Sequence, residues 1–215
     1  MGALVLSIHS QTPELKKIRQ VADALRDGAV VLYPTDTAFS LSCALSNKEG
    51  ISRIRSIRRF SENKELTFLC PDLANIAQFA KVTNQAYKVI KRLIPGPFTF
   101  ILPASKLVPK LAQNPKRKTA GIRVPDNNLS QLLLRELESP IISITAKKED
   151  GSYFDSHDNM MKTMAHFVDI EVQSDKYAFV GQSTIVDMTT DDYSFIRKGA
   201  EFEKVAEYIL SKHKK

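Results

Sequence analysis

Cysteine is scarce and long apolar runs are missing, which excludes several classes of protein. The 215 residues include two cysteines, Cys43 and Cys70, which lie far apart and form no Cys-x-x-Cys pair. We therefore expect neither a disulfide scaffold nor a cysteine zinc site. No apolar run approaches the roughly 20 residues that span a bilayer, and the start of the chain lacks the basic region and cleavage site of a signal peptide. These absences favour a cytoplasmic protein with no membrane segment.

Motifs that mark several familiar catalytic and nucleotide sites are also missing. The sequence has no Gly-x4-Gly-Lys-Ser/Thr loop and no Gly-x-Gly-x-x-Gly fingerprint, so neither a P-loop nor a dinucleotide site is indicated. The lack of a Gly-x-Ser-x-Gly elbow gives no support to a serine hydrolase. The four histidines show no metal-ligand spacing, and we expect no metal held by protein ligands.

The composition is that of an ordinary globular protein with a basic excess. Apolar residues make up 43% and charged residues 26%, and 31 Lys+Arg outweigh 24 Asp+Glu to give a formal charge of +7. A chain of this length buries a substantial hydrophobic core, and no repeat, long linker or low-complexity segment divides it. We therefore expect one domain over residues 1–215. The positive charge indicates a polyanionic partner without identifying it.

Hydrophobic periodicity predicts alternating helices and strands. The first helix is expected between Thr12, as its N-cap, and Gly28. Further helices are expected over 47–59, 73–79, 83–94 and 129–137 and from residue 201 onwards. Short apolar runs predict strands over 29–33, 66–70, 98–102, 121–124, 140–145, 167–172, 183–188 and 193–197. The alternation predicts an α/β fold, and the strand-rich final third predicts a mixed sheet with flanking helices.

A polar segment follows the first of these buried strands. Pro34 stops the strand, and Thr35, Asp36 and Thr37 come directly after it. Ligands of open α/β sheets tend to bind at such strand ends, so these groups are candidates for a site. The alternative is a simple turn in which Asp36 and Thr37 bond to local backbone.

Two basic stretches are candidates for binding phosphate groups. Four arginines, Arg53, Arg55, Arg58 and Arg59, fall within seven residues of a predicted helix, where like charges repel unless they face anions or solvent. Guanidinium groups bind phosphate oxygens bidentately. A second stretch, 106–123, contains three consecutive basic residues and could bind the backbone of RNA. Solvent-exposed surface explains either stretch equally well. The residues predicted to contact RNA are Arg55, Arg59, Lys116, Arg117 and Lys118.

Six segments taken together resemble one family. They are Tyr33-Pro34-Thr35-Asp36-Thr37, Ile57-Arg58 through Lys64, Pro95-Gly96-Pro97-Phe98-Thr99, the run from Lys118 to Pro125, the run from Pro140 to Ala146, and Ser183-Thr184-Ile185-Val186-Asp187. Each segment alone is a weak signal, but six in this order and spacing are specific. The sequence resembles the YrdC/YciO family of threonylcarbamoyl-AMP synthases and their relatives over nearly its whole length.

The resemblance implies both a fold and a chemistry. The fold would be a single-domain, twisted, open α/β sheet of YrdC type that encloses a basic concave cavity. In the synthases, threonine and bicarbonate form a carbamate that attacks the α-phosphate of ATP, and pyrophosphate leaves. The acyl-adenylate product later modifies an adenosine of tRNA. ATP with magnesium and threonine or a related small carboxylate are therefore the ligands that the resemblance implies.

The resemblance also implies which residues hold these ligands. Threonine would contact Thr37, Arg123, Ser143 and Ser183. ATP would contact Arg58, Lys64, Thr119, Thr145 and Arg197. No residue matches a position with a defined catalytic role. If the assignment is correct, the basic residues of the two sets should converge on one pocket.

The sequence also departs from the family pattern. Phe60 replaces an arginine of a Lys-x-Arg pair, Leu69 replaces a histidine, and Lys147 replaces the asparagine of a Ser-x-Ser-Ala-Asn motif. The segment Phe39-Ser40-Leu41-Ser42 stands where the family has Tyr-Gly-Leu-Gly. These departures are similar to the YciO branch, and the length implies that the extra C-terminal domain of longer synthases is absent.

Three functions remain open from the sequence. The first is a threonylcarbamoyl-AMP synthase-like nucleotidyltransferase. The second is a non-catalytic factor that binds double-stranded RNA, tRNA or rRNA through the same basic cavity. The third is a binder of small carboxylates with a repurposed pocket. The sequence predicts no oligomeric state.

Overall fold

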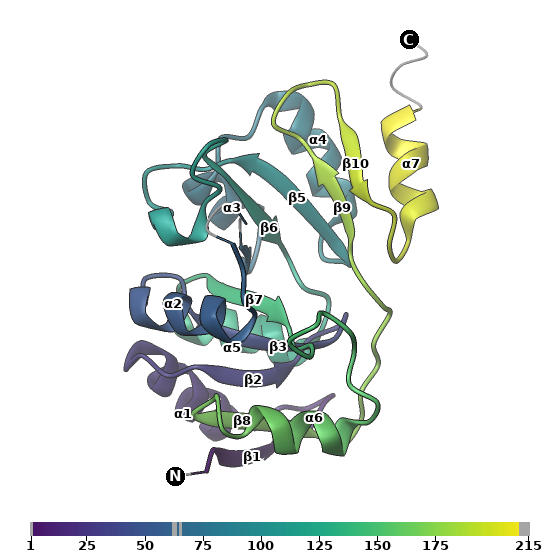
Figure 1. Cartoon of the computed structure of the whole chain (residues 1–215). Helices are drawn as coiled ribbons and strands as arrows, with labels where there is room; N and C mark the ends of the chain where they lie inside the picture. Colours follow the sequence, from purple (N-terminus) through teal and green to yellow (C-terminus); the bar gives the residue numbers. More distant parts are fainter. Residues whose placement is uncertain (1, 62–63, 65, 211–215) are drawn as a thin grey trace.

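A ten-stranded sheet runs through the whole molecule (Figure 1). The structure is a computed structural model that describes residues 2–61, 64 and 66–210. The strands follow the order β1-β8-β2-β3-β7-β4-β6-β5-β9-β10 across the sheet. Their bounds are β1 Leu4–Ile8, β2 Val31–Pro34, β3 Phe39–Ala44, β4 Thr67–Leu69, β5 Phe98–Pro103, β6 Thr119–Arg123, β7 Ile141–Thr145, β8 Ile170–Ser174, β9 Thr184–Asp187 and β10 Ser194–Arg197.

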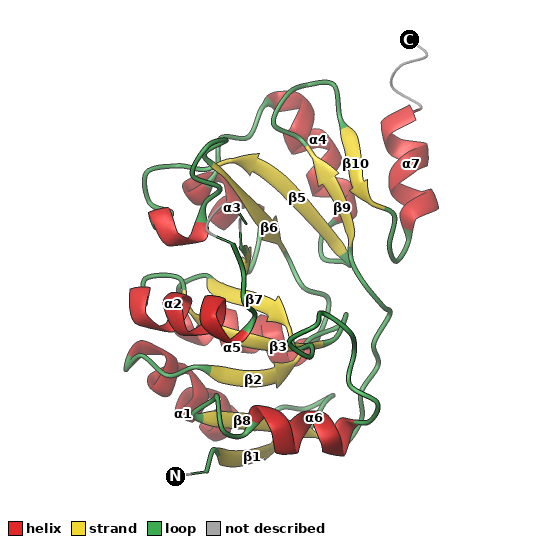
Figure 2. Ribbon diagram, in the orientation of Figure 1, coloured by secondary structure: helices red, strands yellow, loops and turns green. Residues whose placement is uncertain are grey.

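The sheet is mixed, as the sequence predicts. Parallel pairs join β8 to both β1 and β2, β4 to β6, and β5 to β9. Antiparallel pairs join β3 to β2 and β7, β4 to β7, β5 to β6, and β9 to β10. The sheet twists strongly, because β8, β2 and β7 run across the view of Figure 2 while β5, β6 and β9 run obliquely.

Helices cover both faces of the sheet. Their bounds are α1 Leu15–Arg26, α2 Lys48–Ile57, α3 Leu73–Phe79, α4 Asn84–Leu93, α5 Asn128–Leu137, α6 His157–Met164 and α7 Phe202–Leu210, with a short 3-10 helix at Lys110–Ala112. Helices α1 and α5 pack on the face that carries Val31, Tyr33 and Ile141. The other helices pack on the opposite face, where Leu32 and Leu41 lie in a larger core. Successive side chains of β2 and β3 point to opposite faces of the sheet, so the helices on the two sides bury both faces.

The predicted α/β fold with a mixed open sheet is confirmed, and three elements are additional. The sequence analysis did not predict β1, β3 or α6. Strand β3 does have the period-two pattern of a strand, since Phe39, Leu41 and Cys43 alternate with serines, but all six of its residues are buried. The N-cap predicted at Thr12 is wrong, because α1 begins at Leu15 and the Thr12 hydroxyl contacts Nδ1 of His9 at 2.9 Å.

The turn between β3 and α2, which contains Asn47, fixes the second helix in place. The Asn47 side chain caps α2 by accepting the N–H of Gly50 at 2.9 Å, and its amide donates to the Gly28 carbonyl at 2.8 Å. A Cβ at Gly50 would lie 2.8 Å from Cβ of Cys43, so only glycine allows α2 to pack this closely on β3. This anchoring matters for function because the C-terminal end of α2 delivers Arg58.

Candidate functional site

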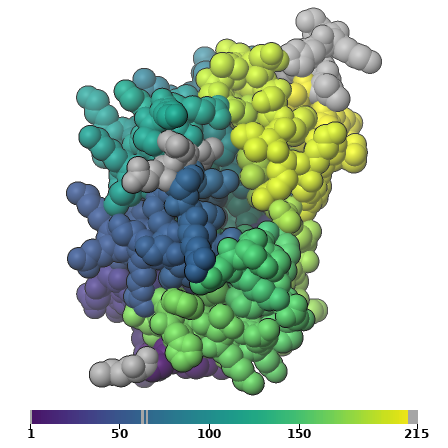
Figure 3. Space-filling view, viewed as in Figure 1, coloured from purple at the N-terminus to yellow at the C-terminus, as the bar shows by residue number. Residues whose placement is uncertain are grey.

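A cavity of about 290 Å³ lies where the halves of the sheet meet. Its walls come from the β2–β3 turn, the end of α2, the end of β7 and the β9–β10 pair. In Figure 3 the blue, green and yellow parts of the chain meet near the middle of the face shown. Among the residues that the structure describes, no carboxylate lines it. The cationic lining residues are Arg58, Lys64, Arg123, Lys147 and Arg197. The hydroxyl-bearing ones are Thr37, Ser40, Thr67, Thr99, Ser143, Thr145, Tyr153 and Ser183.

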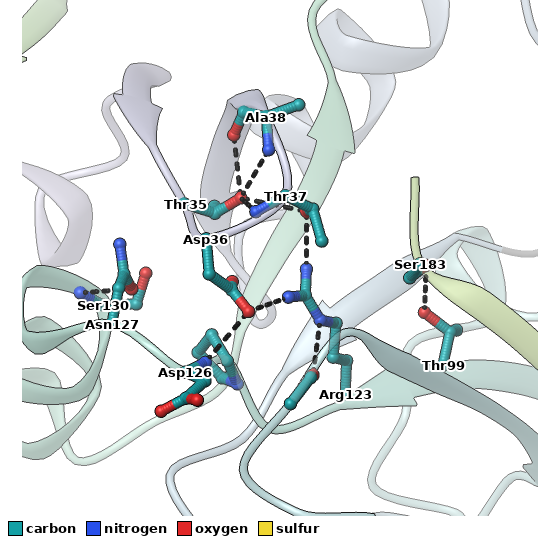
Figure 4. Close-up of polar contacts among 12 residues, drawn as sticks. Thr35, Asp36, Thr37, Ala38, Thr99, Arg123, Asp126, Asn127, Ser130 and Ser183 are labelled. Atoms are coloured by element: carbon teal, nitrogen blue, oxygen red, sulfur yellow. Dashed lines mark hydrogen bonds and ion pairs between the residues drawn. The ribbon is translucent and has the colours of Figure 1, made fainter. Parts of the chain in front are cut away.

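Arg123 is the most firmly held of these cations. It lies at the end of β6, is 4% exposed, and forms an ion pair with Asp36 (Figure 4). Its Nη1 donates to the Thr37 hydroxyl at 2.7 Å, and its Nε donates to the Gly96 carbonyl at 3.1 Å. Burial lowers the pKa of Arg123, and the Asp36 carboxylate opposes this shift. A guanidinium has five N–H groups, so these three bonds leave two for a ligand.

The β2–β3 turn combines both interpretations that the sequence left open. The Thr35 hydroxyl donates to the Ala38 carbonyl at 2.7 Å and lies 3.1 Å from the Thr37 hydroxyl, as expected for a polar turn. Asp36 turns away from the local backbone toward Arg123 and also accepts the N–H of Asp126 at 3.1 Å. The turn therefore holds a buried arginine and presents Thr37 to the cavity.

Arg197 forms a second fixed cation on the opposite wall. From β10 its guanidinium donates to both the carbonyl and the hydroxyl oxygen of Ser183, each at 2.8 Å. The Ser183 hydroxyl also lies 2.9 Å from that of Thr99 (Figure 4). A Cβ at Gly199 would collide with the carbonyl oxygens of Gln182 and Ser183, so the missing side chain permits this close approach. Burial lowers the pKa of Arg197.

Arg58, at the end of α2, and Lys147, just after β7, add two further cations to the lining. Arg58 is 9% exposed, and its Nη1 donates to the carbonyls of Lys147 and Lys148, both at 2.9 Å. Its guanidinium lies 5.4 Å from the ring centre of Phe60, while the Lys147 ammonium lies 4.1 Å from that of Tyr153. Burial lowers the pKa of Lys147, and the nearby charges of Arg58 and Arg197 lower it further.

Four of the residues that depart from the family pattern line the cavity. Phe60 loses a positive charge but places a ring beside Arg58, and Lys147 adds a positive charge to the same cavity. Ser40, which replaces a glycine, contacts the Ser143 hydroxyl at 2.8 Å. Leu69, which replaces a histidine, lines the cavity with an apolar side chain.

The predicted ligand contacts converge, with one exception. All four residues predicted to contact threonine line the cavity, as do Arg58, Lys64, Thr145 and Arg197 of the set predicted for ATP. Thr119 is not among the lining residues. It is 3% exposed at the start of β6, and its hydroxyl has no hydrogen-bond partner within the described part of the chain. Contact of Thr119 with ATP stays a prediction.

The residues predicted to contact RNA lie outside the cavity. Arg55 donates to the carbonyls of Leu111, Ser61 and Lys64, at 2.9, 2.9 and 2.6 Å, and so braces the loop after α2. Arg59 pairs with Glu149 and Arg117 with Asp187. RNA binding by this set, with Lys116 and Lys118, stays a prediction.

Sequence reasoning missed several residues of the site. Tyr153 and Gln182 lie in loops that carry no recognisable motif, and Thr99 lies within an apolar strand. Asp36 was noticed for its place after a strand, but its role as the partner of Arg123 depends on a contact across 87 residues of sequence.

The described part of the chain contains no cluster of three metal-ligating side chains and no helix long and apolar enough to cross a bilayer.

Comparison with known proteins identifies the family. Residues 23–199 match the profile of the Sua5, YciO and YrdC proteins, which carries the description telomere recombination. The chain belongs to this family. The resemblance that the six sequence segments indicated is therefore confirmed.

Relatives within the Sua5/YciO/YrdC family extend over most of the chain. An uncharacterized protein of Haemophilus influenzae is 34% identical over 197 residues, which are 90% of this chain and 94% of the relative. The crystal structure of YciO from E. coli has a TM-score of 0.84 and 32% identity, covering 92% of this chain and 96% of YciO. These matches support the similarity to the YciO branch.

A threonylcarbamoyl-AMP synthase of the same family matches less of the chain, whereas Sua5 matches nearly all of it in fold. The enzyme of Vibrio vulnificus is 31% identical over 135 residues, which are 61% of this chain and 72% of the enzyme. P. abyssi Sua5, in a crystal structure complexed with L-threonine, has a TM-score of 0.87 at 22% identity and covers 97% of this chain and 61% of Sua5. The Sua5 match shows the shared fold alone.

Proposed function

We propose that the protein is a threonylcarbamoyl-AMP synthase-like nucleotidyltransferase that binds ATP and threonine, or a related small carboxylate, in the basic cavity. The observation that carries the proposal is the charge of the lining. Five cationic side chains face one cavity and no described carboxylate does. Like charges repel one another in a partly enclosed space. The binding of a polyanion such as a triphosphate is therefore favourable, because it neutralises this excess of positive charge.

The two walls of the cavity suit different parts of the reaction. Arg123 keeps two free N–H groups beside the Thr37 hydroxyl, an arrangement that suits a carboxylate. Arg58, Lys147 and Arg197 have no carboxylate partner within the described part of the chain and suit phosphate oxygens. The proposed division places the amino acid near β6 and the triphosphate near α2 and β10.

The proposed reaction needs these cations because charge develops on a leaving group. The threonine amine forms a C–N bond to the carbon of bicarbonate, and water leaves to give a carbamate. One oxygen of the carbamate bonds to the α-phosphorus of ATP while the bond to the bridging oxygen of the β-phosphate breaks. Pyrophosphate leaves with that electron pair. Cations fixed before the reaction stabilise the developing charge without reorganising, which is the usual source of catalysis in phosphoryl and nucleotidyl transfer.

Magnesium would enter this site with the substrate. The cavity lining offers hydroxyls and cations but no described carboxylate, and carboxylates are the protein ligands that Mg²⁺ prefers. The described lining residues therefore do not make a resident magnesium site, and Mg²⁺ bound to the phosphates of ATP is the form that fits.

Pyrophosphate release tests the proposed function. Purified protein with MgATP, bicarbonate and L-threonine should release pyrophosphate at a rate that depends on threonine, with threonylcarbamoyl-AMP detected by mass spectrometry. The variant Arg58→Met should lower the rate at least tenfold. Arg59→Asn is the matched control, because Arg59 is exposed and its φ of 46° is tolerated by asparagine. Release that is absent, or independent of threonine, would contradict the proposal.

A salt titration of RNA binding tests the alternative function, that of a non-catalytic RNA-binding factor. Binding that depends on contacts to the RNA backbone weakens steeply with salt. If threonine-dependent release is absent and a double-stranded RNA binds with a steep salt dependence that Lys116→Met and Lys118→Met reduce, the RNA-binding factor replaces the enzyme as the better account.

A further inference from the structure

A groove of about 690 Å³ lies between α2 and α6, and residues of both helices and of the loop that precedes α6 line it. Lys147 is the one described residue that also lines the basic cavity. Its ammonium lies 4.1 Å from the ring centre of Tyr153, which lines the basic cavity and not the groove. The groove is therefore a separate space, and other residues supply its charges. We refer to it as the α2–α6 groove.

The lining of the α2–α6 groove is mostly apolar and partly open to solvent. Ile57 and Phe154 are half-buried, Met164 is buried, and Phe167 is 40% exposed. Spaces of roughly 300–1,000 Å³ with a mostly apolar lining and a few polar groups are typical of sites for small organic molecules. The size and the lining of the groove therefore suit a ligand with an apolar body.

Cations supply much of the polar part of this lining. Arg53 and Arg59, two of the four arginines that the sequence analysis singled out, line the groove together with Lys148. Glu149 is the one acidic residue that lines it within the described part of the chain. This excess of positive charge favours an anion and opposes a cation.

The carboxylate partners of these cations can be exchanged for a ligand. Arg53 lies 2.7 Å from Asp169 and Lys148 lies 2.9 Å from Asp155, and neither carboxylate lines the groove. All four side chains are partly exposed, and ion pairs in contact with water contribute little to stability. A carboxylate that enters with an apolar body can therefore share or replace these partners at small cost, while burial of the apolar body supplies the affinity.

We propose that the α2–α6 groove binds a small amphipathic anion. Its apolar chain would lie against Phe154, Met164 and Phe167, and its carboxylate would lie among the cations of the lining. A single free molecule fits better than a membrane surface, because the apolar residues line a recess between two helices and do not form one protruding face. The inference goes beyond the proposed function, since none of these residues is assigned to ATP or threonine.

Fatty acids of increasing length test the apolar contact. Calorimetric titration of the whole protein with hexanoate, octanoate and decanoate, each below its micelle concentration, should show an affinity that rises by up to about fourfold per methylene. Phe167→Ala should weaken decanoate binding at least about fivefold. Phe179→Ala is the matched control, because Phe179 has a similar exposed fraction of 41% and does not line the groove. It should leave the affinity unchanged.

A charged and an uncharged ligand of the same chain length test the role of the cations. The double variant Arg53→Met and Lys148→Met should weaken decanoate binding at least about tenfold and leave decan-1-ol binding unchanged. The Lys148 carbonyl that holds Arg58 is unaffected by this substitution. The double variant Lys88→Met and Lys162→Met is the matched control, because it removes the same net charge from two exposed lysines that do not line the groove. It should bind both ligands as the wild type does.

Three results would overturn the inference. The first is that the wild type does not bind decanoate. The second is that Phe167→Ala and the Arg53→Met and Lys148→Met variant both bind decanoate as the wild type does, because the ligand then lies elsewhere. The third is that phosphatidylglycerol vesicles bind the wild type and not Phe167→Ala while decanoate binds neither, which would assign the groove to a membrane surface. None of these titrations contains ATP, so the proposed function stands or fails separately.

Discussion

Among single residues, Arg123 depends most on its surroundings, because its charge is buried and Asp36 is its one carboxylate partner among the described residues. Removing one partner of a buried ion pair leaves the other charge uncompensated. We expect Asp36→Asn to lower the free energy of unfolding by about 3 kcal/mol, measured by urea denaturation. Glu149→Gln, in the exposed pair with Arg59, should cost less than about 1 kcal/mol. Equal effects of the two variants would show that Arg123 is not held as described.

Lys147 offers a second prediction at the same scale. Its side chain faces the cavity, whereas its backbone carbonyl holds Arg58 and is unaffected by substitution of the side chain. We expect Lys147→Met to weaken MgATP binding about tenfold, because a charged hydrogen bond contributes roughly 1.5–3 kcal/mol, and Lys147→Arg to restore most of it. Calorimetry of both variants checks this. If Lys147→Met binds as tightly as wild type, the added cation does not compensate for the arginine replaced by Phe60.

Sequence reasoning found the residues that stand at strand ends and missed those in loops. Thr37 follows β2 and Arg123 ends β6, where ligands of such sheets bind, whereas Ser143, in the middle of β7, was predicted by the family resemblance alone. The loops that carry Tyr153 and Gln182 have no periodicity, so their approach to the site depends on tertiary packing alone. Thr119 was predicted to contact ATP and does not line the cavity, because it lies at the opposite end of β6 from Arg123, about 13 Å away along the same face of the strand.

Among the elements, α2 connects stability to function, because its packing on β3 positions Arg58. Alanine usually stabilises a helix interior relative to glycine by about 1 kcal/mol. For Gly50→Ala we expect the opposite, a decrease of at least about 1 kcal/mol in the free energy of unfolding. The new Cβ would lie 2.8 Å from Cβ of Cys43 and 2.6 Å from the capping Asn47 side chain.

Thermal or urea denaturation of Gly50→Ala measures this loss. Ser52→Ala is the control, since Ser52 is exposed on the same helix and alanine there should be neutral or slightly stabilising. A gain in stability from Gly50→Ala would mean that α2 packs less closely on β3 than the structure indicates.

Elements with strong periodicity or turn signals could be predicted, and those with mixed patterns could not. Helices α4 and α5 have clear apolar spacing and capping residues, Thr83 and Asn127, whose side chains do cap them. Helix α6 was missed because His157, Asp158 and Asn159 open it with polar residues, and its three methionines alone face the core. Strand β1 was missed because its exposed apolar residues resemble neither a buried run nor an alternating one.

For the whole molecule, the buried carboxyl of Glu171 makes stability depend on pH. Glu171 is 4% exposed in β8, and its Oε1 has no hydrogen-bond partner within the described residues. Burial raises the pKa of this carboxyl. The folded protein therefore binds a proton at Glu171 more tightly than the unfolded chain, in which glutamates have a pKa of about 4.3. The contribution of Glu171 to stability is present below this pH and falls as pH rises through the raised pKa of the folded state.

Glu171→Gln removes this titration. At pH 7.5 the variant should be more stable than the wild type by about 1 kcal/mol, and the difference should shrink as the pH falls toward about 4.3. Urea denaturation of both proteins across this range gives the difference directly. A difference that stays constant with pH would show that Glu171 does not titrate abnormally.

Part of the net charge of +7 is gathered in the basic cavity, although most basic side chains of the chain do not line it. Several of those form ion pairs, as Arg26 does with Asp23 and Arg53 with Asp169. Arg58, Lys147 and Arg197 instead bond to carbonyls, hydroxyls or rings, which leaves their charge for a ligand. The central claim is that this ligand is the phosphate group of a nucleotide.

Titration of MgATP into the wild type, Arg197→Met and Lys198→Met tests that claim most directly. The two variants remove the same charge from adjacent residues, but only Arg197 lines the cavity, and Lys198 is exposed with its ammonium over the ring of Phe202. The account predicts that Arg197→Met weakens binding at least tenfold while Lys198→Met changes it less than twofold. Equal affinities for the two variants, or no binding of MgATP by the wild type, would contradict it.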